Sequence, residues 1–218
     1  MKILLTSAGL TNKTIINTLS DLVGKKPEDT NLVFIPTASN VEEGDKGWLI
    51  DDLLNLKKQN FKQIEIVDIS ALPIEIIKKR FEEADILYFE GGNTNYLMDW
   101  INRLDLKNYL IELLKSKVWV GVSAGSMVTN PTLDLKTSQY IYGEDFDKTE
   151  SMDGLNFVNF YSLPHINSPY FVNARFEKIE EIAKNFDCKI YAIDDNSAIK
   201  IVDDFVEVAG EGVWKEWN

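Results

Sequence analysis

One serine lies in a turn of the kind that presents a nucleophile. Ser123 is the central residue of GVSAG at 121–125, which matches the pattern G-x-S-x-G and ends the apolar run VWVGV at 118–122. Small neighbours allow a sharp turn from a strand into a helix, and the first N–H groups of that helix can receive an oxyanion. The pattern predicts a nucleophilic Ser123. A glycine- and serine-rich turn without chemistry is the alternative.

The chain contains one histidine, His165, which follows the apolar segment 160–164. A serine hydroxyl needs a base beside it at neutral pH, and an imidazole can take and return that proton. Because the carboxyl ends of parallel strands build the sites of α/β proteins, we expect His165 near Ser123. A lone histidine without a catalytic role is the alternative. With one cysteine, Cys188, a zinc site is not expected, and we predict no metal.

Two glycines precede a helical pattern in the segment EGGNTN at 90–95. Adjacent glycines let backbone N–H groups approach a ligand closely. A tetrahedral intermediate needs two donors at its oxyanion, and the N–H groups of Gly92 and Ala124 are the candidates. The phosphate-binding patterns G-x-G-x-x-G and G-x-x-x-x-G-K-[ST] do not occur in the sequence. Glycines that serve only tight packing are the alternative.

A carboxylate is expected to orient the base and to stabilise its imidazolium. Asp194 and Asp195 both follow the apolar strand pattern at 189–193, which places them at the carboxyl end of a strand. Most Asp-Asp pairs are solvated turns, and the residues alone do not decide between these two.

Strand patterns alternate with helical patterns over the first 123 residues. The expected strands are 2–7, 31–37, 63–69, 84–92 and 118–123, and the expected helices are 11–23, 45–60, 73–81 and 94–116, the last broken near Asp105. This alternation predicts a three-layer αβα sandwich with a mostly parallel sheet. The strand patterns beyond it are 160–164, 189–194, 198–203 and 205–209, with a helix at 170–186. We expect Glu211-Gly212 to turn a C-terminal hairpin, and one α/β domain to span 1–218.

The composition excludes several classes of protein. The chain has 35 acidic and 23 basic residues, a net charge of −12, which disfavours nucleic acid and anionic membranes as partners. Its apolar runs are shorter than a membrane span, and the N-terminal run is shorter than a signal-peptide core. One cysteine cannot form an intrachain disulfide. We therefore expect a cytoplasmic protein. Trp214 and Trp217 could contact a second copy or belong to the core, which leaves a homodimer open.

Three separated segments together resemble one family of peptidases. FEGGNT at 89–94, GVSAGS at 121–126 and LPHIN at 163–167 are similar, in order and spacing, to segments of the dipeptidase E and cyanophycinase peptidases. The resemblance covers nearly the whole chain. It implies a fold like that of class I glutamine amidotransferases, and hydrolysis of small peptides beside aspartate without cofactor or metal.

The resemblance also implies roles for individual residues. The family's serine falls on Ser123, its histidine on His165 and its late acidic residue on Asp195, and the oxyanion donors fall on Gly92 and Ala124. In the same segments the candidates for substrate binding are Asn93, Thr94 and Asn167.

Two departures from the family's pattern leave alternatives open. An earlier aspartate of some members falls on Ser138, and the nearby Asp134 is out of register. No arginine or lysine stands clearly where an aspartyl side chain would need a cation. An esterase or amidase on the same fold is therefore one alternative, although Cys188 lies on no nucleophile turn. A catalytically inactive protein that binds a small ligand is the other.

Overall fold

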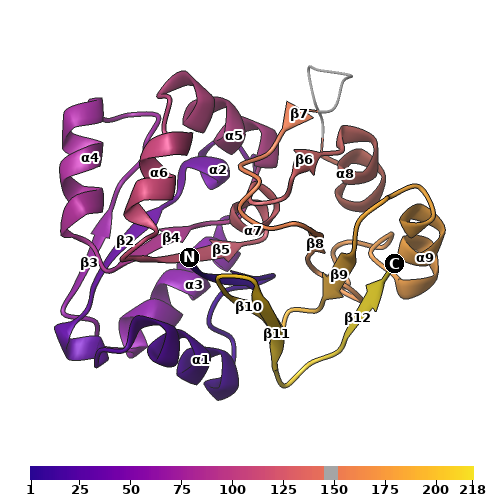
Figure 1. Ribbon diagram of the computed structural model, residues 1–218, viewed down its shortest axis with the longest axis horizontal. Coiled ribbons are helices and arrows are strands. Elements are labelled where there is room, and N and C mark those ends of the chain that lie inside the picture. The colour runs from indigo at the N-terminus through magenta and orange to yellow at the C-terminus, as the bar shows by residue number, and fades with distance from the viewer. Residues whose placement is uncertain (145–151) are drawn as a thin grey trace.

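A mixed sheet of seven strands forms the centre of the protein (Figure 1), whose computed structural model describes residues 1–144 and 152–218. In sheet order the strands are β11 (Phe205–Gly210), β10 (Ser197–Val202), β1 (Lys2–Thr6), β5 (Val118–Val122), β4 (Ile86–Phe89), β2 (Asn31–Ile35) and β3 (Gln63–Ile66). The five strands from β1 to β3 in this order are parallel, and β10 and β11 continue the sheet antiparallel. The mostly parallel sheet is thus confirmed.

Helices cover both faces of this sheet (Figure 1). One face carries α1 (Lys13–Val23) and α3 (Gly47–Lys58), and the other carries α4 (Ile74–Glu83), α5 (Thr94–Arg103) and α6 (Lys107–Leu113). Each face has its own apolar cluster, for example Leu19 and Leu56 on the first and Phe81 and Leu97 on the second. Burial on both faces explains why the central strands are continuous apolar runs. The expected three-layer arrangement is confirmed.

The C-terminal part of the chain forms a second, smaller sheet. It consists of β12 (Trp214–Trp217), β9 (Ile190–Ile193) and β8 (Tyr161–Leu163), and α9 (Phe176–Ala183) packs against it. Strands β8 and β9 are parallel, with Leu163 opposite Ala192. The segments that leave these two strands, which carry His165 and Asp195, therefore start at the same edge of the sheet.

Short elements complete the described chain. They are the 3₁₀ turn η1 (Pro27–Asp29), the helices α2 (Thr37–Asn40), α7 (Ala124–Met127) and α8 (Leu135–Tyr142), and the paired strands β6 (Thr132–Leu133) and β7 (Met152–Asp153). No helix in the described ranges combines the length and apolarity that crossing a bilayer requires.

The structure confirms one detail of the expected elements and corrects two. Asp105, with a φ of 48°, separates α5 from α6, which confirms the break predicted near this residue. The C-terminal hairpin is present, but it joins β10 to β11; the segment at Glu211-Gly212 leads instead to β12, which pairs with β9. The helix expected at 170–186 is confined to α9, because residues before it form a loop that the Arg175 guanidinium holds through three backbone carbonyls.

Candidate active site

Ser123 occupies the strained turn between β5 and α7. Its φ of 47° and ψ of −106° lie in a region that residues with a side chain rarely adopt. Close packing enforces the turn: a Cβ added at Gly125 would lie 2.0 Å from the Phe89 carbonyl oxygen, so this position requires glycine. The turn therefore lifts the Ser123 side chain to the carboxyl edge of the sheet, as the G-x-S-x-G pattern predicts.

A second serine locks this turn to the neighbouring strand. The buried Ser126 hydroxyl lies 2.8 Å from the carbonyl oxygens of Thr6 and Gly121, and it accepts a hydrogen bond from the Thr6 N–H at 3.0 Å. The Ser123 N–H donates to the Thr6 carbonyl at 3.0 Å. Strand β1 therefore holds both ends of the turn.

The glycine turn between β4 and α5 lies against Ser123. A Cβ built on Gly91 would be 3.2 Å from the Ser123 Cβ. Gly92 has a φ of 128°, and a Cβ there would be 2.3 Å from the Ala38 carbonyl oxygen. The Asn93 N–H donates to the same carbonyl at 2.9 Å. The glycine turn that carries the expected Gly92 donor thus lies next to the serine turn, and the expected Ala124 donor begins α7 directly after Ser123.

His165 and Asp195 form a close pair. The His165 Nδ1 is 2.7 Å from the Asp195 Oδ1, with 14% of the histidine side chain and 38% of the aspartate side chain exposed. The imidazole also packs on the Phe171 ring, with centroids 4.8 Å apart. With Nδ1 turned to the carboxylate, Nε2 is the nitrogen that remains for proton transfer.

Asp194 makes different contacts from its neighbour. Its carboxylate accepts hydrogen bonds from the N–H groups of Asn196 and Val213 and from the Ser197 hydroxyl. These bonds close the turn after β9. Asp194 is thus part of a turn, while Asp195 faces the imidazole.

The end of β1 ties the histidine segment to the serine turn. The Ser7 hydroxyl accepts from the His165 N–H at 2.9 Å and donates to the Ile193 carbonyl at 3.1 Å. Thr6, the preceding residue, accepts from the Ser123 N–H. Two consecutive residues therefore hold the backbones of Ser123 and His165. No sequence pattern predicts this role for Ser7, which is only the polar last residue of the strand expected at 2–7.

The candidates for substrate binding have partners within the protein. The Asn93 Oδ1 accepts from the Tyr96 N–H at 2.9 Å and caps α5. The Thr94 hydroxyl donates to the Glu144 Oε1 at 2.8 Å. Asn167 is exposed, and its N–H donates to the Ala174 carbonyl at 2.7 Å. The structure therefore places Asn93 and Thr94 at the glycine turn and Asn167 in the loop after His165.

Two positions bear on the earlier aspartate of the family pattern. Ser138 is buried in α8, and Asp134 caps that helix by accepting from the Lys136 N–H and the Thr137 hydroxyl. The acid that lies at the imidazole is Asp195.

Three carboxyl groups near the glycine turn were not found from the sequence. Burial raises the pKa of Glu144 to about 7, although the hydrogen bonds from Thr94 lower it. Asp52 and Glu90 are 5% and 1% exposed, their carboxyl groups interact, and the Tyr88 hydroxyl donates to Asp52 at 2.7 Å. Burial raises the pKa of both members of this pair, that of Glu90 well above its usual range. These contacts join residues far apart in sequence, so no sequence motif predicts them.

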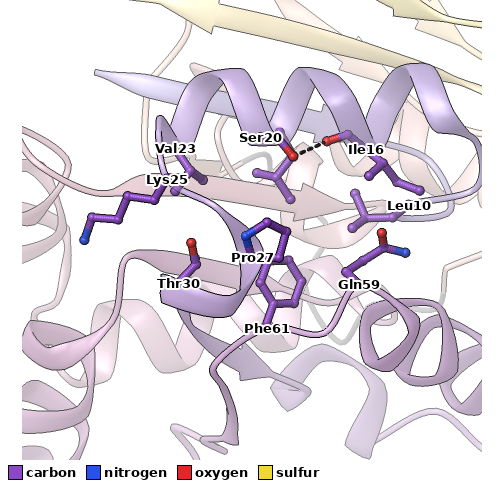
Figure 2. A pocket seen from close by; sticks show the side chains of 10 residues that line it. Leu10, Ile16, Ser20, Val23, Lys25, Pro27, Thr30, Gln59 and Phe61 are labelled. Carbon is purple, nitrogen blue, oxygen red and sulfur yellow. Dashed lines mark hydrogen bonds between the residues drawn. The ribbon is translucent and has the colours of Figure 1, made fainter.

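A small cavity lies under α1 (Figure 2). Its volume is about 10 Å³, and apolar side chains such as Leu10, Ile16 and Phe61 line most of it. That is room for about one water molecule. Within 1–144 and 152–218 no cluster of three or more His, Cys, Asp or Glu side chains is arranged to hold a metal.

Comparisons with known proteins identify a peptidase family and several relatives named as peptidases. The sequence model of Peptidase family S51 matches residues 3–209. Uncharacterized peptidase PM1590 of Pasteurella multocida is 28% identical over 179 residues, which are 80% of this chain and 82% of the relative. Uncharacterized peptidase Lmo0363 of Listeria monocytogenes is 29% identical over 191 residues, 84% of either chain. Peptidase E of Streptomyces coelicolor is 24% identical over 138 residues, 61% of this chain and 55% of its own.

Solved structures show the same fold. A peptidase E candidate from Listeria monocytogenes superposes with a TM-score of 0.77 at 24% identity, and the match covers 97% of this chain and 98% of that one. A peptidase from an acI-B1 Actinobacterium gives a TM-score of 0.69 at 20% identity, over 96% and 87% of the two chains.

Proposed function

The chain belongs to peptidase family S51 and is a serine hydrolase of the peptidase type, and from this premise we propose that it hydrolyses small peptides through Ser123, His165 and Asp195. The observation that carries the proposal is the 2.7 Å contact between His165 and Asp195, in a segment that Ser7 ties to the strand end beside the Ser123 turn. A nucleophile, a base and an orienting acid are the parts that acyl transfer needs.

The proposed reaction follows from these positions. Asp195 holds the proton of His165 on Nδ1, so that Nε2 accepts the proton of the Ser123 hydroxyl as its oxygen attacks the peptide carbonyl. The same nitrogen then gives that proton to the leaving amine. Water hydrolyses the resulting acyl-enzyme by the same steps and restores the free serine.

Backbone donors supply the second part of the proposed mechanism. In this proposal the N–H groups of Gly92, in the turn that lies against Ser123, and of Ala124, the residue after it, receive the oxyanion of the tetrahedral intermediate. Each such donor contributes on the order of 2.7–4 kcal/mol to transition-state stabilisation in enzymes where one was removed. Both donors belong to backbone that tight packing fixes, at Gly92 against Ala38 and at the serine turn against Phe89.

Aspartyl dipeptides are the substrates that the family resemblance implies, and for this chain they are one candidate among small peptides. An aspartyl side chain requires a cation in the site. The ionisable side chains that the structure places at the glycine turn include Glu90 and Glu144, and neither can supply a positive charge. Ester and amide substrates, and binding without turnover, are the alternatives that a substrate panel separates.

A single substitution tests the proposal. We expect Ser123→Ala to lower kcat on a dipeptide panel by at least about 10³-fold, because the nucleophile is lost while the fold remains. Ser116→Ala, which removes a hydroxyl from an exposed position after α6, is the matched control and is expected to retain full activity. Circular dichroism shows whether both variants are folded. Normal turnover by a folded Ser123→Ala protein would contradict the proposal.

A further inference from the structure

A half-exposed tryptophan borders the proposed nucleophile. Trp48 is the second residue of α3, and 43% of it is exposed. A Cβ built on Gly91 would be 3.8 Å from the Trp48 Cζ3 and 3.2 Å from the Ser123 Cβ. The indole edge and the serine side chain thus lie against the same glycine. A bound substrate at Ser123 would lie next to this ring.

The helix that carries Trp48 is fixed to the glycine turn. Asp52 follows Trp48 by four residues, so the two side chains share one face of α3. The buried Asp52 carboxyl accepts from the Tyr88 hydroxyl of β4 at 2.7 Å and interacts with the Glu90 carboxyl, and Glu90 directly precedes Gly91. The start of α3 is therefore held against the end of β4, and Trp48 has a defined place beside the turn.

Sheet order places Trp48 on one particular side of the nucleophile. Strand β5, which leads to Ser123, lies between β1 and β4. His165 is attached on the β1 side, through Ser7, whereas Trp48 lies on the β4 side, against Gly91. The leaving amine takes its proton from the imidazole and so departs on the β1 side. The β4 side is left for the acyl part of the substrate.

We propose that Trp48 contacts the substrate and forms the wall of the acyl-side subsite, so that the enzyme favours a large apolar or aromatic side chain on the residue before the scissile bond. This proposal rests on the proposed peptidase function. An aromatic or aliphatic side chain against the indole would cover ring surface that is now exposed, which is favourable because apolar area leaves water.

A lysine beside this ring raises the alternative that the enzyme favours an acidic substrate side chain. The Lys46 ammonium is 5.8 Å from the Trp48 ring centroid and could pair with an acidic substrate side chain. The ammonium already donates to the Glu42 carbonyl oxygen, within a loop that also carries the acidic side chains of Glu43 and Asp45. These acids lower the positive potential that an aspartyl side chain would meet. The site therefore favours an apolar substrate side chain over an acidic one.

The test measures kcat/KM for three dipeptides that differ only in the first residue: Phe-Leu, Ala-Leu and Asp-Leu. We expect the wild-type protein to favour Phe-Leu over Ala-Leu by about 10-fold, the usual scale for one apolar contact. Trp48→Ala is expected to bring that ratio close to one, and Trp48→Phe to keep most of it. Ile50→Ala, a truncation on the same helix at a residue that is 56% exposed, is the control and is expected to leave the ratio unchanged.

Binding to a protein without the nucleophile separates the two proposals. We expect Ser123→Ala protein to bind Phe-Leu in calorimetry, and the added Trp48→Ala change to weaken this binding by about 10-fold. If Trp48→Ala weakens dipeptide binding but the wild-type protein hydrolyses no dipeptide, the peptidase function is overturned and the Trp48 subsite is retained. Turnover with a Phe-Leu to Ala-Leu ratio that Trp48→Ala does not change would overturn the subsite alone. A preference for Asp-Leu that Lys46→Met abolishes, or no binding of any dipeptide, would also overturn it.

Discussion

At the scale of single residues, two adjacent aspartates have different neighbours. The Asp195 carboxylate is 2.7 Å from the His165 Nδ1, while the Asp194 carboxylate accepts two backbone N–H bonds and one hydroxyl bond that close the turn after β9. One acid can therefore fix the tautomer of the base, and the other stabilises the segment that carries it. The pair offers a matched experiment, because the same substitution can be made at either position.

We expect Asp195→Asn to lower kcat by about 10³- to 10⁴-fold with little change in thermal stability. The amide can donate to Nδ1, which turns the imidazole into the tautomer whose Nε2 carries the proton, and it cannot stabilise the imidazolium. Steady-state kinetics on a hydrolysed dipeptide measures the effect.

Asp194→Asn is the control for that experiment. The new amide NH₂ group would face an N–H or O–H donor that the Asp194 carboxylate now accepts. We therefore expect a lower melting temperature, with kcat within a few-fold of wild type. A larger loss of kcat in Asp194→Asn than in Asp195→Asn would reverse the roles assigned to the two residues.

At the scale of elements, the junction of β1, β5 and α7 holds the nucleophile turn. Ser126 joins the three elements, because its hydroxyl contacts the Thr6 and Gly121 carbonyls and accepts from the Thr6 N–H in a buried place. The strain at Ser123 persists only while such contacts outweigh it. Stability and activity should therefore fall together when this hydroxyl is removed.

We expect Ser126→Ala to lower the free energy of unfolding by about 1–3 kcal/mol, because the buried Thr6 N–H loses its side-chain acceptor. We also expect kcat to fall by about 10-fold or more, since a small displacement of the nucleophile is costly. Chemical denaturation and dipeptide kinetics give the two values. Thr30→Ala removes another buried hydroxyl, one that donates to the Lys26 carbonyl, and is expected to affect stability alone. A wild-type kcat in Ser126→Ala would show that the Ser123 turn keeps its active geometry without the Ser126 hydroxyl.

The elements also show which parts of the structure are readable from sequence. Central strands such as β5 are predictable because burial on both faces demands a continuous apolar run. The partner of β12 was not predictable: the strand has four residues, and it pairs with β9 rather than with the preceding β11. Short strands of this kind carry too little pattern to define a register.

The candidate site divides in the same way. Ser123 and His165 follow from local patterns, a glycine-flanked serine and a single histidine after a strand. Trp48 and the Asp52–Glu90 pair gain their positions only when α3 docks on the end of β4. No spacing in the sequence marks such contacts, because they join different elements through the tertiary fold.

At the scale of the whole molecule, the Asp52–Glu90 pair joins three parts of the fold. Asp52 belongs to α3, Tyr88 belongs to β4, and Glu90 directly follows that strand. The loop after β1 closes over the pair, since a Cβ on Gly9 would be 2.1 Å from the Asp52 Oδ1. Burial, and for Glu90 also the charge of Asp52, raises the pKa of both carboxyl groups. The folded protein therefore keeps a proton on the pair at a pH where the unfolded chain has lost it.

This difference fixes the direction of a pH effect on stability. When the folded state binds more protons than the unfolded state, the free energy of unfolding falls as pH rises, by up to about 1.4 kcal/mol per pH unit for one proton. The fall begins near the ordinary carboxyl pKa of about 4 and continues upward to the raised pKa of the folded protein. Glu90→Gln replaces the acid that must stay protonated by an amide that is neutral at every pH. We therefore expect this variant to lose stability less steeply than wild type between about pH 5 and 8, measured by urea denaturation across that range. Glu112→Gln, at an exposed position of α6, is expected to retain the wild-type slope. Equal slopes in wild type and Glu90→Gln would mean that the pair ionises freely in the folded protein, and that its burial at the glycine turn does not depend on a shared proton.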